Sequence, residues 1–132
     1  MIIAKETVMP SPTDRRYSDT HEWFKAQGAI VTVGLSRHAA DELTDITYVD
    51  LPKAGEAVAR GQAFGEIESV KATNELYSAV DGQVMRSNAA LTTDPGLVNT
   101  DPYGAGWLIM VETQGADLSA LMTAEEYDAK YG

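Results

Sequence analysis

Lys71 is the residue of this 132-residue chain whose surroundings point most clearly to chemistry. On either side of it, residues 63–69 and 72–78 mix apolar, β-branched and small polar side chains in near alternation, which is typical of two half-buried strands. The lysine is therefore predicted at or beside the tip of a β-hairpin. A tip leaves the amine within reach of a second enzyme, and two paired strands hold it on a rigid support. Both conditions suit a lysine that is to be acylated.

Two glycines frame this hairpin at a distance, and we expect both in turns. Gly55 lies in the sequence Lys-Ala-Gly-Glu and Gly82 in Val-Asp-Gly-Gln, contexts in which a turn with positive φ favours glycine. The predicted tip is thus held between two outer turns.

Few other residues have the types and spacing that catalysis or metal binding needs. The chain has no cysteine, which excludes disulfides, thiolate nucleophiles and Cys-ligated zinc, so any sulfur redox chemistry must arrive with a cofactor. His21 and His38 lack the spacing of a metal motif, and no nucleophile elbow, P-loop or dinucleotide-binding glycine run is present. We expect no metal site and no catalytic residues, and we interpret Trp23 and Trp107 as core anchors.

Composition and charge limit which binding partners and which cellular location we expect. The formal net charge of −10 argues against binding to nucleic acid or to anionic membranes, because both need clustered Lys and Arg. No apolar run reaches transmembrane length, and residues 1–5 are followed too soon by Glu6 for a signal peptide. A cytoplasmic protein is the simplest inference.

The predicted elements indicate one mostly β domain. Residues 1–16 carry two prolines and no sustained period, so we predict an extended or mobile leader followed by a domain over 17–132. The predicted elements besides the lysine hairpin are a hairpin over 17–35 with a turn at 27–28, a helix over 37–43 capped by Ser36, strands at 46–49, 83–86 and 107–111, a turn or helix start at 93–96, and a last helix opened by a Thr123–Glu126 capping box. Many short strands with peripheral helices predict a flattened barrel or a sandwich.

The order and spacing of the residues around Lys71 resemble those of proteins that carry lipoate on a hairpin lysine. Gly55, residues 68–72 and Gly82 carry this resemblance, which sharpens to the glycine cleavage system H proteins and extends over residues 17–127. The further matching stretches are His21-Glu22-Trp23, Val33-Gly34-Leu35, Asp50-Leu51-Pro52, Leu97-Val98-Asn99, Asp101-Pro102-Tyr103-Gly104 and Gly106-Trp107-Leu108-Ile109.

The resemblance implies a lipoyl-domain-like fold of two small antiparallel sheets and a covalent lipoyl group on Lys71. It also implies that Glu68 and Gly82 help a lipoate ligase or octanoyl transferase to recognise the hairpin. Thr20, Glu22 and Glu75 occupy the positions that serve in the family to dock the loaded arm.

The function implied is that of a non-catalytic carrier in glycine catabolism. The carrier takes an aminomethyl group from the PLP-dependent glycine decarboxylase to a tetrahydrofolate-dependent aminomethyltransferase, and dihydrolipoyl dehydrogenase then reoxidises it. A monomer is favoured because no long apolar helix stripe is left unpaired. The resemblance also places the protein in the mitochondrial matrix if its source is eukaryotic.

Some positions depart from the pattern of the family. Thr44 stands where a glycine is common and Ala79 where a proline is common, while Glu42 could alter the docking set.

Three other functions compete with that of an H protein. A biotin carrier usually has methionines beside its lysine, and a lipoyl domain of a 2-oxoacid dehydrogenase usually has an Ala/Pro linker; neither feature is present. The third competitor, an H-like protein that relays lipoate to other acceptors, uses the same lysine.

Overall fold

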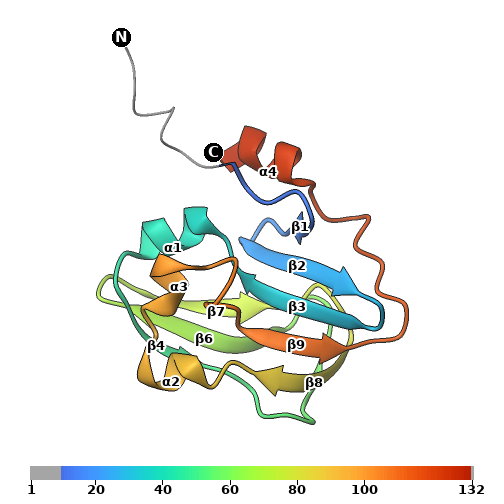
Figure 1. The fold of residues 1–132 in the computed structure, drawn as a ribbon, viewed down its shortest axis with the longest axis horizontal. Helices are drawn as coiled ribbons and strands as arrows, with labels where there is room; N and C mark the ends of the chain where they lie inside the picture. The colour runs from blue at the N-terminus through green and yellow to red at the C-terminus, as the bar shows by residue number, and fades with distance from the viewer. Residues whose placement is uncertain (1–9, 132) are drawn as a thin grey trace.

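The computed structural model describes residues 10–131 and shows two antiparallel β-sheets with short helices around them (Figure 1). The larger sheet has the strand order β1-β2-β3-β9-β8-β5, and the smaller sheet has the order β4-β6-β7. The strands are β1 (Arg16–Tyr17), β2 (Glu22–Gln27), β3 (Ile30–Leu35), β4 (Ile46–Asp50), β5 (Ala57–Val58), β6 (Ala63–Ser69), β7 (Thr73–Tyr77), β8 (Gly82–Ser87) and β9 (Ile109–Glu112). The helices are α1 (Arg37–Leu43), α2 (Ala90–Thr93), α3 (Leu97–Thr100) and α4 (Ala124–Tyr131).

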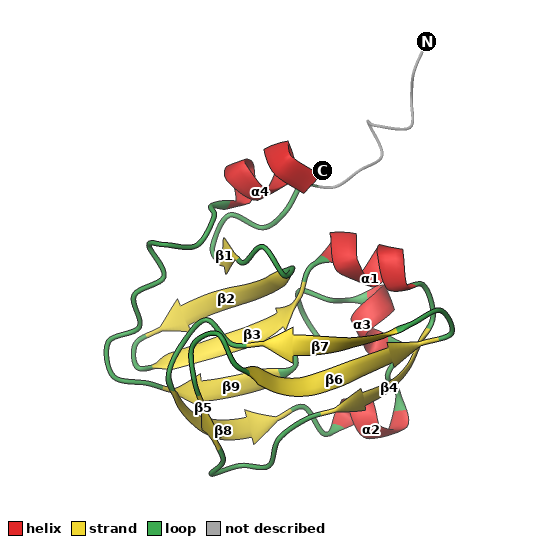
Figure 2. Ribbon diagram, turned by 180° about the vertical axis from the view of Figure 1, so that it is seen from behind, coloured by secondary structure: helices red, strands yellow, loops and turns green. Residues whose placement is uncertain are grey.

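The predicted fold class is confirmed, as a sandwich rather than a closed barrel. The two sheets stay separate, and the helices lie at the periphery: α1, α2 and α3 around one end of the smaller sheet, α4 beyond β1 (Figure 2). Within residues 10–131, none of the helices is long and apolar enough to cross a membrane.

The predicted helix starts are confirmed by their caps. The Ser36 hydroxyl accepts a hydrogen bond from the backbone nitrogen of Ala39 at 3.2 Å, which satisfies a free donor in the first turn of α1. The capping box at α4 is reciprocal: Thr123 N donates to the Glu126 carboxylate at 2.9 Å, and Glu126 N donates to the Thr123 hydroxyl at 3.2 Å. The segment predicted as a turn or helix start, 93–96, connects α2 to α3.

Apolar side chains pack into three clusters. One consists mainly of residues of the larger sheet, one joins α1 and α3 to the smaller sheet, and one joins α4 to β1 and β2. The main members of the three clusters are, in that order, Phe24, Val33 and Ile109; Leu43, Ile67 and Leu76; and Tyr17, Trp23 and Tyr127. Ile67 and Leu76 are fully buried, so the hairpin that carries Lys71 is anchored in the core through its stem.

Trp23 is a core anchor, as predicted, and it explains a nearby glycine. Its side chain is buried, and its indole nitrogen donates to the backbone oxygen of Pro102 at 3.1 Å. Gly34 is its partner on β3, where a Cβ atom would lie 2.3 Å from the indole ring. Trp107 is only half-buried and packs against the edge of the same cluster.

One of the two framing glycines has a different role from the predicted one. Gly55 has a φ of 93° and lies in a turn, as expected. Gly82 does not have a positive φ. A Cβ atom on Gly82 would lie 2.3 Å from the backbone oxygen of Glu112 on β9. The prediction of a positive φ at Gly82 was therefore wrong, because this glycine is required by a close backbone approach.

The predicted leader lies partly outside the described residues, which begin at residue 10. The backbone nitrogen of Ser11 donates to the Asp128 carboxylate on α4 at 3.0 Å, and the Tyr17 hydroxyl donates to the backbone oxygen of Pro12 at 2.7 Å. The Arg15 guanidinium lies 4.5 Å from the centre of the Trp23 ring. Residues 11–16 therefore contact the domain, while the domain boundary at residue 17 stays a prediction.

Candidate functional site

Lys71 lies at the tip of the β6–β7 hairpin, as predicted. The strands leave three residues between them, Val70, Lys71 and Ala72, and Ser69 N donates to Ala72 O at 2.8 Å across this turn. The Ser69 hydroxyl accepts from the backbone nitrogens of Lys71 and Ala72, each at 3.1 Å. A serine immediately before the tip thus pairs two amides that the turn would otherwise leave free.

The tip contacts the last turn of α1 and the segment that links α1 to β4. Lys71 Nζ donates to the backbone oxygen of Glu42 at 2.8 Å, and Val70 N donates to the backbone oxygen of Asp45 at 3.1 Å. The Lys71 side chain is exposed, and 69% of Val70 is exposed. The amine is therefore accessible, although in this conformation it lies back against α1. The expected effect of the Glu42 carboxylate on the docking set stays a prediction.

A cleft of about 730 Å³ runs between β7, α1 and the segment 19–22, and Lys71 is among its lining residues. Thr20, Glu22 and Glu75, predicted to dock a loaded arm, all line it, as does Glu42. The structure therefore brings Lys71 and the three predicted docking residues to one cleft, although their role in docking stays a prediction. The other polar lining residues are Asp19, His21, His38, Thr73, Asn74 and Tyr77.

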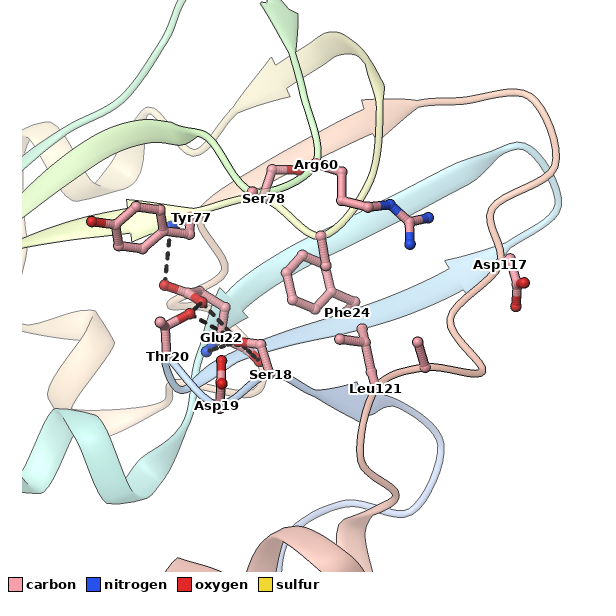
Figure 3. Close-up of a pocket in the computed structure, with 13 residues that line it drawn as sticks. Ser18, Asp19, Thr20, Glu22, Phe24, Arg60, Tyr77, Ser78, Asp117 and Leu121 are labelled. Carbon is pink, nitrogen blue, oxygen red and sulfur yellow. Dashed lines mark hydrogen bonds between the residues drawn. The ribbon is translucent and has the colours of Figure 1, made fainter.

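Glu22 is a buried carboxyl group in the wall of this cleft, with only 1% of its surface exposed. Its Oε1 accepts hydrogen bonds from the Thr20 and Ser18 hydroxyls, the latter at 2.8 Å, and its Oε2 accepts from Tyr77 N at 3.0 Å (Figure 3). Burial raises the pKa of Glu22, and these hydrogen bonds partly offset the shift.

The charge of Glu22 has no cationic partner within residues 10–131, where the ion pairs involve other residues. A buried carboxylate with neutral donors alone is stabilised further by a cation. Glu22 also borders a second cavity of about 410 Å³, lined in part by Phe24, Arg60 and Leu121 (Figure 3). A cationic group that entered the cleft could thus share hydrogen bonds with a carboxylate that is already oriented.

The two histidines join the cleft to α4. His21 Nδ1 lies 2.7 Å from the Tyr127 hydroxyl, which lies 2.7 Å from the Ser36 hydroxyl at the start of α1. The rings of His21 and His38 are 5.0 Å apart, and burial together with the neighbouring His38 lowers the pKa of His21. Within the described residues no group of three or more His, Cys, Asp or Glu side chains could hold a metal ion.

Glu68 and Gly82, predicted to guide the modifying enzyme, lie in different places. Glu68 is half-buried in the hairpin stem, where its Cα partners are Tyr48 and Thr73. Gly82 opens β8 and lines a separate cavity with Arg60, not the Lys71 cleft. A role in recognition stays a prediction for both residues, and the close approach to β9 explains Gly82 without it.

Thr44, where the resemblance predicts a glycine, adopts a backbone conformation that favours glycine. The φ of Thr44 is 60° and its ψ is −141°. Thr44 directly follows α1 and precedes Asp45, whose backbone oxygen accepts from Val70 N. Sequence reasoning identified Thr44 as a departure but missed its strain. It also missed Asn99, whose side chain binds the same segment, although the stretch 97–99 matched the family.

Comparisons with known proteins agree with this geometry. The family model described as "Glycine cleavage H-protein" matches residues 15–131. A probable glycine cleavage system H protein from Natronomonas pharaonis is 46% identical over 119 residues, which cover 90% of this chain and 94% of the relative. The H protein of Picosynechococcus is 48% identical over 119 residues, covering 88% and 90%.

A mitochondrial relative and a solved structure extend the likeness. Glycine cleavage system H protein 2 of Arabidopsis thaliana is 46% identical over 115 residues, which cover 86% of this chain and 74% of the relative. The crystal structure of a glycine cleavage system H protein from Mycobacterium marinum matches this fold with a TM-score of 0.82. The two sequences are 40% identical, and the match covers 90% of this chain and 97% of the Mycobacterium marinum chain. The chain belongs to the glycine cleavage H-protein family.

Proposed function

We propose that this chain carries lipoate in amide linkage on Lys71 and acts as the mobile carrier of the glycine cleavage system. The observation that supports this most strongly is the position of Lys71. An exposed amine lies at the tip of a short hairpin loop and borders a cleft whose wall contains the buried Glu22 carboxylate. Membership of the H-protein family makes lipoate the expected group.

The residues around Lys71 fit such a group. The amine can be reached from solvent, and the adjoining cleft of about 730 Å³ is lined in part by apolar side chains such as Leu35, Leu43 and Ile67. Lipoate would supply the two redox-active sulfur atoms that a chain without cysteine lacks. The site therefore suits lipoate in two ways: the amine is accessible, and lipoate would bring the sulfur chemistry that the chain lacks.

The chain's own residues would hold and shield what the arm brings into the cleft. Glu22 would accept hydrogen bonds from a cationic amine, while Ser18, Thr20 and the backbone of Tyr77 keep its carboxylate oriented. Glu75, whose carboxylate accepts from the Tyr77 hydroxyl at 3.0 Å, would add a second negative charge. Closing the arm over these groups would exclude water.

The proposed partners are the enzymes that load, unload and reset the carrier. They are glycine decarboxylase, the aminomethyltransferase and dihydrolipoyl dehydrogenase, with a lipoate ligase or octanoyl transferase acting first. We further propose that the chain is a non-catalytic monomer, cytoplasmic or, in a eukaryote, in the mitochondrial matrix. An H-like relay that passes lipoate to other acceptors is the alternative.

Reconstitution separates the carrier from the relay. The lipoylated protein is mixed with glycine decarboxylase, and exchange of the glycine carboxyl group with labelled bicarbonate is measured. The proposal predicts exchange that depends on the carrier, disappears with Lys71→Arg and weakens with Glu22→Gln. A lipoylated protein that supports no exchange, yet donates its lipoyl group to another acceptor in the presence of a lipoyl transferase, would identify the relay instead.

A further inference from the structure

The Lys71 tip is held in place from outside its own hairpin by one short segment. Val70 N donates to the backbone oxygen of Asp45 at 3.1 Å, and Lys71 Nζ donates to the backbone oxygen of Glu42 at 2.8 Å. Both acceptors belong to residues 42–45, which comprise the end of α1 and its connection to β4. Where this segment lies therefore determines where the lysine is presented.

The connecting segment has little to fix it by itself. Glu42 and Asp45 are exposed, as is Thr44, whose φ of 60° is unfavourable for a β-branched residue. Of residues 42–45, only Leu43 is buried in the core. The Glu42 oxygen belongs to α1, which is anchored through buried Leu43, but some other part of the fold must keep the Asp45 oxygen in position.

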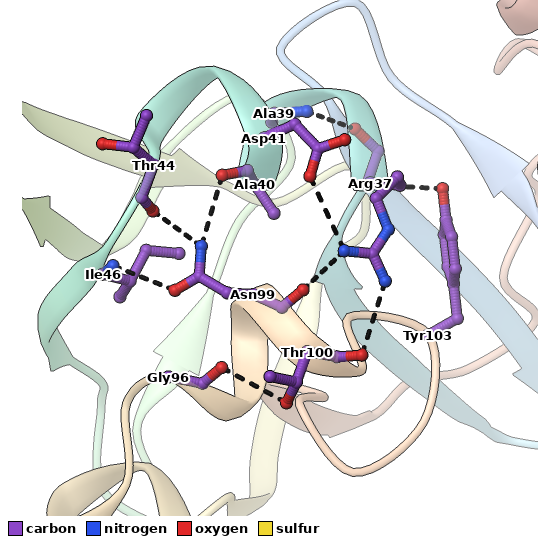
Figure 4. A network of polar contacts seen from close by, with 11 residues as sticks. Arg37, Ala39, Ala40, Asp41, Thr44, Ile46, Gly96, Asn99, Thr100 and Tyr103 are labelled. Carbon is purple, nitrogen blue, oxygen red and sulfur yellow. Dashed lines mark hydrogen bonds and ion pairs between the residues drawn. The ribbon is translucent and has the colours of Figure 1, made fainter. Parts of the chain in front are cut away.

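Asn99 on α3 supplies the missing contacts. Its amide nitrogen donates to the backbone oxygens of Thr44 at 2.6 Å and Ala40 at 3.4 Å, and its amide oxygen accepts from Ile46 N at 2.9 Å (Figure 4). These contacts bracket Asp45 from both sides. One side chain, more than fifty positions away in sequence, therefore binds the end of α1 and the start of β4 together.

Asn99 is itself fixed to the core. Its neighbour Val98 is fully buried, and the Arg37 guanidinium donates to the backbone oxygens of Asn99 and Thr100, the latter at 3.4 Å (Figure 4). The Tyr103 hydroxyl in turn accepts from Arg37 N at 2.9 Å. A rigid support thus runs from the core through α3 to the segment that holds the tip.

We propose that Asn99 is a positioning residue for Lys71, which acts through residues 44–46 to hold the hairpin tip where a lipoate-attaching enzyme meets it. The inference rests on the proposed function, because it concerns the presentation of the lysine for lipoylation. The Asn99 side chain does not line the Lys71 cleft, and its hydrogen bonds go to backbone atoms of Ala40, Thr44 and Ile46. Its effect passes through the Asp45 oxygen to the Val70 amide.

Hydrogen exchange of the unmodified protein tests the positioning directly. In Asn99→Ala, the Val70 amide is expected to exchange about tenfold faster than in the wild type, because the oxygen to which it donates is no longer held. Asn88→Ala is the matched control. The Asn88 side chain also binds three backbone groups, Ala105 O, Trp107 O and Ala90 N, but lies outside the Lys71 cleft. This control should leave the Val70 amide unchanged.

Attachment of lipoate by a purified lipoate ligase provides the second readout. The kcat/KM for Asn99→Ala is expected to fall about tenfold, mainly through a higher KM, while Asn88→Ala keeps the wild-type value. Should Asn99→Ala fail to fold, Asn99→Asp replaces it, because its carboxylate still accepts from Ile46 N but cannot donate to Thr44 O.

The outcomes separate this inference from the proposed function. Equal Val70 exchange in the Asn99 and Asn88 variants, or equal lipoylation kinetics, would overturn the positioning role. If the wild type itself takes no lipoate at Lys71, the proposed function fails, and the exchange experiment still decides whether Asn99 holds the tip.

Discussion

The ammonium nitrogen of Lys71 lies 2.8 Å from the backbone oxygen of Glu42, so the unmodified lysine rests against the last turn of α1. Both residues are exposed, and water can replace either partner. We therefore expect Lys71→Gln, which removes the charge as acylation does, to change the free energy of unfolding by less than about 0.5 kcal/mol.

Urea denaturation measures this difference, with Lys53→Gln as a control for the loss of an exposed lysine elsewhere. A loss above about 2 kcal/mol in Lys71→Gln alone would mean that the lysine is structural. That result would contradict its assignment as a free attachment point.

Glu22 should make stability depend on pH in a defined direction. Burial raises the pKa of Glu22 in the folded state above its unfolded value, so the folded protein binds this proton more tightly. The resulting stabilisation is complete below the unfolded pKa and is lost as the pH rises through the folded pKa. Over a series from about pH 4 to pH 8, wild type should therefore lose stability relative to Glu22→Gln as the pH rises above the ordinary pKa of glutamate.

Denaturation of both proteins across this pH range, with exposed Glu125→Gln as the control, checks the direction. A wild type that gains stability over Glu22→Gln with rising pH would show that the hydrogen bonds from Ser18, Thr20 and Tyr77 outweigh burial.

Thr44→Gly should stabilise the protein. The φ of 60° and ψ of −141° at Thr44 are accessible to glycine without strain, and relief of about 1–3 kcal/mol exceeds the entropy cost of about 0.5–1 kcal/mol. The expected net gain is about 1 kcal/mol in chemical denaturation. Thr47→Gly, in strand β4, should lose stability instead. A loss of stability in Thr44→Gly would mean that the Thr44 side chain contributes more than its backbone strain costs.

Three exposed carboxylates form a row across the smaller sheet. Glu66 is the Cα partner of both Asp50 and Glu75, and like charges directly opposite each other are unfavourable. Glu66→Gln should therefore raise the free energy of unfolding by about 0.5 kcal/mol at low salt. The gain should shrink near about 1 M salt, where charges are screened within roughly 3 Å.

Glu125→Gln is the matched control for this row, because a carboxylate in the first turn of α4 is favourable. Removing it should give no stabilisation. A salt-independent gain in Glu66→Gln would point to packing, rather than to charge repulsion, as the cause.

Local patterns predicted much of the fold. The hairpin around Lys71, the Ser36 cap of α1 and the Thr123–Glu126 box all depend on residues close together in sequence, and all three are present. The match of Thr20, Glu22 and Glu75 to family positions led to the same cleft as Lys71. Short-range periodicity and capping carry this information because the interactions themselves are short-range.

The contacts that sequence reasoning missed join distant residues. Asn99 binds Thr44 and Ile46, and Tyr127 links His21 to Ser36, at separations that no local pattern records. The glycine at position 82 was attributed to turn geometry, whereas it is needed because the backbone of Glu112 lies too close for a Cβ atom. Such features depend on how elements pack, so they emerged only from the assembled sandwich.

The attachment of lipoate to Lys71 is the central claim, and one measurement tests it most directly. The protein is produced in cells supplied with lipoate and a ligase, its intact mass is recorded, and the peptide that carries Lys71 is sequenced by mass spectrometry, with Lys71→Arg as the control. The account predicts one lipoyl increment, located on Lys71 and missing from the control. A bare Lys71 under these conditions, or an increment on another lysine, would contradict it.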